Sequence, residues 1–111
     1  ISAAVDAEAE DAVALLQKIV DLNSGSLNRA GVDRVGDVME QELRALGFET
    51  RRISMEKLGR GSHVWAQRPG RGAAARNGRR LLLIGHLDTV FEPFSPFQKF
   101  VRDGDRAVGP G

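Results

Sequence analysis

The sequence contains no cysteine, which excludes disulfide bridges and metal sites built on thiolate ligands. No apolar run approaches the ~18 residues that a membrane-spanning helix needs, so we expect no transmembrane segment. The 16 Lys and Arg residues are almost balanced by 15 Asp and Glu, which leaves a formal net charge of +1. This balance gives no electrostatic reason to expect a nucleic acid or an anionic membrane as a partner.

The length of 111 residues corresponds to one domain or to part of one. The apolar content of 41% is enough for a hydrophobic core. The chain begins with Ile1 and not with Met, so we expect that something N-terminal was removed or left out. The lack of cysteine fits a secreted or periplasmic bacterial protein and leaves a cytoplasmic location open.

The segment 68–80 is rich in arginine and glycine but lacks aromatic residues among its arginines. Proteins that bind single-stranded nucleic acids stack the bases on such aromatic residues, so the segment does not indicate nucleic-acid binding. No Gly-Lys-Ser/Thr follows, which excludes a phosphate-binding loop of that type. We interpret the segment as a solvated connection between two antiparallel strands, with Asn77-Gly78 supplying a tight turn.

Two stretches have apolar residues at spacings of three and four, which predicts amphipathic helices over about residues 6–22 and 30–46. Gly47 follows the second helix, where a left-handed residue commonly ends a helix. Glu40 and Arg44 are four residues apart in the favourable order, and we expect this pair on an exposed face. The expected buried stripe of the second helix consists of Val32, Val35, Met39, Leu43 and Leu46.

The sequence after these helices predicts short strands, a loop and a hairpin. Strands are predicted at about residues 48–53 and 62–67, with a turn at 57–61 between them. Residues 91–97 contain three Phe and two Pro, and proline removes backbone donors and fixes φ, so we predict an ordered loop there. Residues 99–108 are predicted to form a hairpin around an Asp-Gly turn.

The stretch RLLLIGHLDTV contains the residues that could form a metal site. Its four apolar residues, 81–84, predict a strand buried on both faces, which ends at Gly85. His86 and Asp88 follow and, on an extended backbone, lie on the same side about 6.6 Å apart. A histidine at the carboxyl end of a strand can be a metal ligand, and a nearby carboxylate can fix its ring or tune the metal. The alternative is a structural, hydrogen-bonded histidine. His63 is not expected to be a ligand, because no acidic residue accompanies it at ligand spacing.

The run LLLIGHLDTVF, with DGDRAVGPG about twenty residues later, resembles the zinc-dependent exopeptidases and deacylases. This family includes glutamate carboxypeptidase (carboxypeptidase G), aminoacylase, acetylornithine deacetylase and succinyl-diaminopimelate desuccinylase. The resemblance extends over nearly the whole chain and is closest to the glutamate carboxypeptidase branch. The matching residues are His86, Asp88, Thr89, Val90, Gly104, Asp105, Gly109 and Gly111.

The resemblance implies an α/β fold, a mixed β-sheet flanked by helices as in zinc exopeptidases (phosphorylase/hydrolase-like). Residues 1–111 would be the N-terminal portion of the catalytic domain, without its remainder and without the inserted dimerisation domain. His86 matches the first-histidine zinc ligand, and Asp88 matches the catalytic aspartate that holds this histidine and adjusts the metal's acidity. The complete site would hold two Zn ions, whose other ligands and glutamate general base lie downstream.

The implied reaction is hydrolysis of a peptide or N-acyl amide bond next to a C-terminal amino acid. The expected partners are therefore a peptide or N-acyl amino acid substrate, and either a second copy in a homodimer or the missing C-terminal part. Two alternatives remain: an amino-acid deacetylase or desuccinylase of the same family, and a catalytically silent binding or scaffold protein on the same fold. Because catalytic zinc normally needs about three protein ligands, we expect that this chain alone neither binds zinc tightly nor hydrolyses a substrate.

Overall fold

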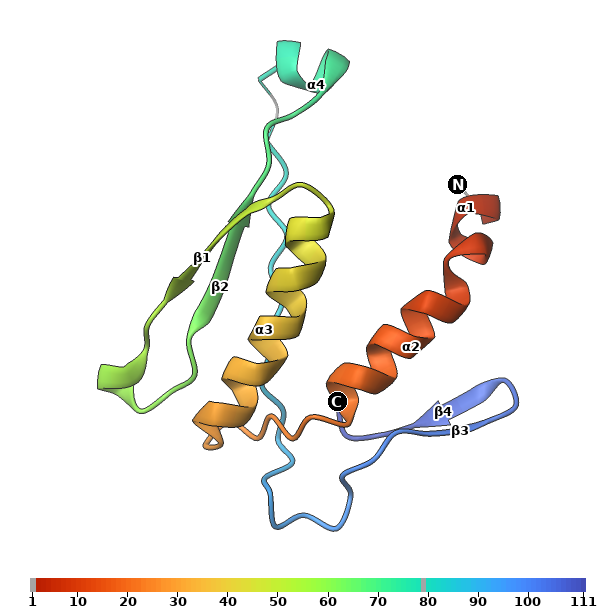
Figure 1. The fold of residues 1–111 in the computed structure, drawn as a ribbon, viewed down its shortest axis with the longest axis vertical. Helices are drawn as coiled ribbons and strands as arrows, with labels where there is room; N and C mark the ends of the chain where they lie inside the picture. The colour runs from red at the N-terminus through yellow and green to blue at the C-terminus, as the bar shows by residue number, and fades with distance from the viewer. Residues whose placement is uncertain (1, 79) are drawn as a thin grey trace.

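Helix α3 lies between an antiparallel hairpin and a second helix in the computed structural model, which describes residues 2–78 and 80–111 (Figure 1). The two sheets have two strands each, and both are antiparallel: β1 pairs with β2, and β3 pairs with β4. No helix in these ranges is both long and apolar enough to cross a bilayer. The elements in chain order are α1 (Ser2–Ala7), α2 (Ala9–Val20), α3 (Arg29–Ala45), β1 (Glu49–Ile53), the 3-10 helix η1 (Glu56–Leu58), β2 (His63–Gln67), α4 (Gly72–Arg76), β3 (Val101–Asp103) and β4 (Arg106–Val108).

The N-terminal helical region differs from the single helix predicted over residues 6–22. The backbone leaves helical geometry at Glu8, which separates α1 from α2. No described residue of α2 is buried, and Leu16 on its apolar side is 46% exposed. The amphipathic pattern therefore predicts the helix correctly, but its apolar stripe has no packed layer against it among the described residues.

Helix α3 confirms the second predicted helix almost to the residue. The Asn28 side chain accepts a hydrogen bond from the backbone N–H of Gly31 at 3.1 Å and caps the N-terminus. Gly47 has φ +81°, as predicted for the residue that ends the helix. The expected burial of Leu46 is wrong, because its side chain is 61% exposed. The buried apolar residues of α3 are Val32, Val35 and Val38.

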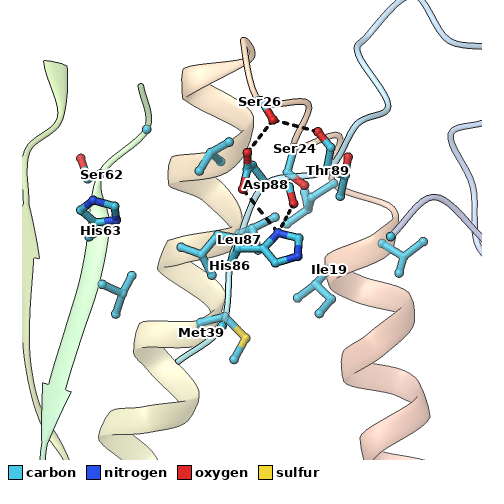
Figure 2. Close-up of a pocket in the computed structure, with 18 of the residues that line it drawn as sticks. Ile19, Ser24, Ser26, Met39, Ser62, His63, His86, Leu87, Asp88 and Thr89 are labelled. Atoms are coloured by element: carbon cyan, nitrogen blue, oxygen red, sulfur yellow. Dashed lines mark hydrogen bonds and ion pairs between the residues drawn. The ribbon is translucent and has the colours of Figure 1, made fainter. Parts of the chain in front are cut away.

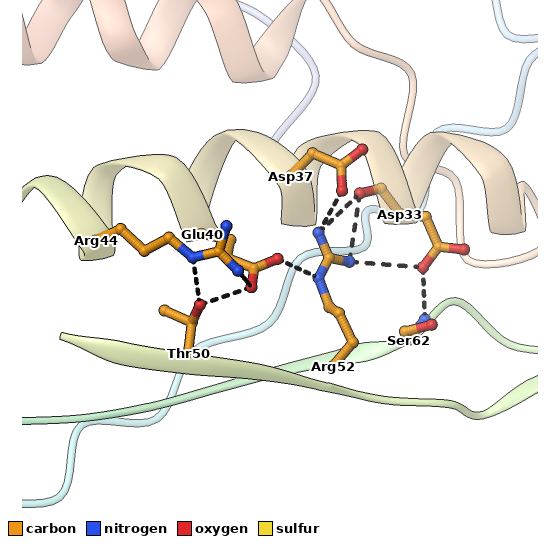
Figure 3. Close-up of polar contacts among 7 residues, drawn as sticks. All are labelled: Asp33, Asp37, Glu40, Arg44, Thr50, Arg52 and Ser62. Atoms are coloured by element: carbon orange, nitrogen blue, oxygen red, sulfur yellow. Dashed lines mark hydrogen bonds and ion pairs between the residues drawn. The ribbon is translucent and has the colours of Figure 1, made fainter.

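Polar side chains of α3 contact strand β1 of the β1–β2 hairpin, as Figure 3 shows. Glu40 accepts hydrogen bonds from Thr50 Oγ1 at 2.6 Å and from Arg52 Nε at 2.9 Å, besides its pair with Arg44. Arg52 also donates to Asp37 at 2.6 Å. The hydrogen bond from Thr50, followed by that from Arg52, holds the pKa of Glu40 below its ordinary value. The prediction of an exposed Glu40–Arg44 pair is thus corrected: Glu40 is 9% exposed, because strand β1 covers it.

The apolar run at 81–84 does not form the predicted buried strand. Leu81, Leu82, Leu83 and Ile84 are 85%, 78%, 82% and 86% exposed, and the run lies outside both sheets. A strand buried on both faces needs neighbouring strands and a layer on each side, and the described residues supply neither. The mixed sheet expected for the fold is therefore not formed by the described residues, although the combination of helices and strands is compatible with part of an α/β domain.

The remaining connections follow local sequence rules with one exception. The predicted hairpin is confirmed as β3 and β4, with Gly104 at φ +57° in its turn. Residues 91–97 form the predicted loop without helix or strand, and the rings of Phe91 and Phe97 meet edge to face with centroids 5.2 Å apart. The exception is the segment 68–80, where helix α4 forms inside the expected loop.

The molecule is flat and open, with extents of 50 × 43 × 18 Å. Its radius of gyration is 16.3 Å, against about 13 Å for a compact domain of this length. Its accessible surface is 8686 Å², against roughly 6,000 Å² for a compact protein of this mass. Leu16 of α2 and the run at 81–84 account for part of this excess, and Leu16, Leu83 and Ile84 border the groove described below.

Candidate metal-ligand site at the His86-Leu87-Asp88 motif

The imidazole of His86 is held from within its own motif. Its Nδ1 lies 2.7 Å from the backbone carbonyl oxygen of Asp88 and 3.4 Å from the Oδ1 atom of the same residue. A carbonyl oxygen only accepts, so Nδ1 is the donor in this contact. The side chain is 81% exposed. In the neutral ring this contact leaves Nε2 as the nitrogen that can bind a metal.

The carboxylate of Asp88 lies between two partners, as Figure 2 shows. Ser26 Oγ donates to its Oδ2 at 2.5 Å, while Oδ1 faces His86. The hydrogen bond from Ser26, ahead of the contributions from the backbone and His86, lowers the pKa of Asp88 from its ordinary value of 3.8 against a smaller opposing effect of burial. The carboxylate is therefore ionised at neutral pH, and it can stabilise positive charge on or beside the ring.

The motif is joined to the segment after α2 by a short parallel pairing. Thr89 N donates to Ser24 O at 2.9 Å, and Ser26 N donates to Thr89 O at 3.0 Å, which forms a bridge between Gly25 and Thr89. The bridge fixes the backbone on the C-terminal side of Asp88. It also places the hydroxyl of Ser26 against the carboxylate.

The loop after the motif supports this pairing from the other side. Glu92 Oε1 accepts a hydrogen bond from Leu27 N at 3.0 Å, and Asn23 Nδ2 donates to Phe91 O at 2.8 Å. A Cβ atom at Gly25 would lie 2.8 Å from the Cα atom of Glu92. Only glycine therefore lets the loop approach this closely. Glu92 is the nearest further carboxylate in the sequence, and here it stabilises the backbone under the motif.

His86 and Asp88 border an open groove of about 810 Å³. Its walls come from the apolar faces of α2 and α3, from the start of β2, and from residues 83–89. Ser24, Ser26 and Thr89 line the same groove near the motif. His63 lies on the β2 side, and Figure 2 shows α3 between it and His86. Polar side chains therefore line the groove at the motif and, as Arg60, Ser62 and His63, at the β2 side, whereas α2 and α3 contribute mainly apolar side chains.

The motif can supply one ligand to a metal ion, the imidazole of His86. No group of three or more His, Cys, Asp or Glu side chains that could hold a metal is present among residues 2–78 and 80–111. A zinc shell with about three protein ligands is therefore not complete within the described part of the chain. His86 as a ligand and Asp88 as its supporting carboxylate stay predictions, with a geometry that is compatible with both roles.

Sequence reasoning identified His86 and Asp88 but missed Ser26 and Asn23. The segment 23–28 reads as a polar break, and no spacing rule relates it to a motif 62 residues away from Ser26. The available signal is the density of Asn and Ser side chains in this break. Such side chains bind backbone groups in place of regular structure, and here they bind a distant segment.

The chain is similar to carboxypeptidase G2 from Pseudomonas sp. (strain RS-16), with 34% identity over 97 residues. The match covers 86% of this chain but only 22% of that protein, so the chain spans about a fifth of the relative's length. No protein-family model matches the chain. No solved structure matches it either. The similarity supports the carboxypeptidase G branch of the family resemblance and does not bear on the aminoacylase, acetylornithine deacetylase and desuccinylase branches.

Proposed function

We propose that this chain forms part of a metal-dependent hydrolase that cleaves a peptide or N-acyl amide bond next to a C-terminal amino acid. The observation that carries the proposal is the geometry of His86: Nδ1 lies 2.7 Å from the carbonyl oxygen of Asp88, and the side chain is 81% exposed beside the groove. The similarity to a protein named as a carboxypeptidase favours this reaction class over other uses of an exposed histidine.

The roles of the residues follow from their geometry. His86 would supply one nitrogen ligand, and Asp88 would hold the ring in the Nδ1–H tautomer and raise its basicity. Two zinc ions, when bound, would polarise the amide carbonyl and lower the pKa of a shared water to about 7. The further ligands and the general base would have to come from residues other than the described ones, either from a C-terminal part or from a partner chain. The groove would then receive the substrate beside the motif.

The test is an activity assay of the intact protein with substrates that release a C-terminal glutamate. Activity should be abolished by EDTA, restored by zinc, and lost in His86→Ala. The matched control is His63→Ala, which removes an imidazole from the other side of the same groove and should retain the bound zinc and an activity that EDTA abolishes. Full activity in His86→Ala would overturn the proposal.

Substrate choice separates the two enzymatic alternatives. N-acetyl and N-succinyl amino acids should be poor substrates if the reaction is that of a carboxypeptidase. If only these are cleaved, the deacetylase or desuccinylase alternative holds. If no amide is cleaved by a protein that binds its zinc, the chain belongs to a binding or scaffold protein.

A further inference from the structure

We propose that Ser26 is a positioning residue of this site, which orients the Asp88 carboxylate and through it the imidazole of His86. The inference rests on the proposed function, because it assigns Ser26 to the same site. Ser26 does not belong to the recognisable motif, and it is brought there only by the fold.

Two sets of hydrogen bonds fix Ser26. Its backbone N–H donates to Thr89 O at 3.0 Å, so the residue cannot move away from the motif without breaking the bridge. Its hydroxyl has one proton and two acceptors within reach, Asp88 Oδ2 at 2.5 Å and Thr89 O at 3.2 Å. The carboxylate is the closer and the charged acceptor, so it takes the proton.

The order of these contacts excludes a serine nucleophile. In a nucleophilic triad the histidine lies between the hydroxyl and the carboxylate and removes the hydroxyl proton. Here the carboxylate of Asp88 lies between Ser26 and His86 (Figure 2). The hydroxyl therefore donates to an acid that is already ionised, and it gains no nucleophilicity from it. Its effect is on the direction of the carboxylate.

The Ser26 hydroxyl is the main constraint on the orientation of the Asp88 carboxylate. The Asp88 side chain is 43% exposed, and Ser26 is the neighbour that binds its Oδ2 among the described residues. Rotation of the carboxylate would remove Oδ1 from Nδ1 of His86 and leave only the backbone carbonyl as its partner. Loss of the groups that orient a metal-bound histidine commonly costs 10–100-fold in metal affinity or activity.

The experiment compares Ser26→Ala and Ser26→Thr in the intact protein. The control is Ser54→Ala, since Ser54 is an exposed serine after β1 whose hydroxyl accepts from Glu56 N, remote from the motif. Zinc affinity is measured by chelator competition, kcat and KM are measured with a glutamate-releasing substrate, and the surroundings of His86 Nδ1 are followed by its side-chain nitrogen shift in metal-free protein. Thermal unfolding is recorded for each variant.

We expect Ser26→Ala to bind zinc about tenfold more weakly and to lower kcat about tenfold, with KM within about twofold of the original. The nitrogen shift of His86 Nδ1 should change as the Asp88 carboxylate turns away from it, although the Asp88 carbonyl oxygen still accepts from Nδ1. Ser26→Thr should restore the zinc affinity, kcat and this shift. Unchanged zinc affinity and Nδ1 shift in Ser26→Ala would overturn the inference. Equal losses in Ser26→Ala and Ser26→Thr that track a lower melting temperature would also overturn it, since the role would then be structural.

His86→Ala in the same series separates this inference from the proposed function. If His86→Ala keeps zinc and activity, the proposed function fails, and the Nδ1 shift in metal-free Ser26→Ala still decides whether Ser26 orients the groups around the ring. If His86→Ala loses both and Ser26→Ala keeps both, only the role of Ser26 fails.

Discussion

We predict that the isolated chain of 111 residues binds zinc weakly, because its motif supplies a single ligand. Structural zinc sites with four protein ligands have apparent binding free energies of about 10–16 kcal/mol at neutral pH, or roughly 2.5–4 kcal/mol for each ligand. His86 supplies one such ligand, and no cluster of three is present among the described residues. One ligand corresponds to a Kd of about 1–15 mM.

The measurement is isothermal titration of zinc into the isolated chain, with circular dichroism to establish that its helices are present. His86→Ala should remove part of the weak binding, and the exposed His63 should account for the rest. A submicromolar Kd that depends on His86 would refute the reasoning, because the described residues would then hold ligands that their geometry does not bring together. The same titration on the intact protein should give tight binding if the proposed function is correct.

Three further predictions concern the support of the site and the fold. Asn28→Ala removes the cap of α3 and should cost about 1 kcal/mol of unfolding free energy in chemical denaturation; an unchanged midpoint would contradict the capping role. Gly25→Ala should cost about 1–3 kcal/mol because its Cβ would meet the backbone of the 91–97 loop, whereas Gly85→Ala, with no atom within 4 Å of its Cβ, should be tolerated. Because the pKa of Glu40 is lowered in the folded state, its contribution is present at neutral pH and is lost as the pH falls below its ordinary value of 4.5. The melting temperature should therefore fall on acidification, and less steeply in Glu40→Gln; parallel pH profiles would contradict this.

The features that depend on a few neighbouring residues could be predicted from the sequence. Helix α3, its end at Gly47, and the hairpin with Gly104 in its turn all follow from periodicity and from the conformations that glycine permits. The side chains of His86 and Asp88 also lie close together, with 3.4 Å between Nδ1 and Oδ1, as their spacing indicates.

The features that depend on distant partners could not be predicted in the same way. The burial of the run at 81–84 requires layers that the described residues do not form, so its apolar composition alone gives the wrong exposure. Glu40 has its predicted partner Arg44, but Arg52, twelve residues along the chain, helps to bury it. Ser26 reaches Asp88 across 62 residues, and the bridge to Thr89 and the contacts of the following loop bring the two together.

The parallel bridge also determines when the motif can take up its folded arrangement during protein synthesis. It joins Ser26 to Thr89, which are 63 residues apart, and closing a loop of that length costs about 4 kcal/mol in chain entropy. At a translation rate of about 5–20 residues per second, the serine segment would wait roughly 3–13 s for its threonine partner. In that interval α3 and the β1–β2 hairpin can already form, so we expect His86 to be oriented late, onto a preformed support.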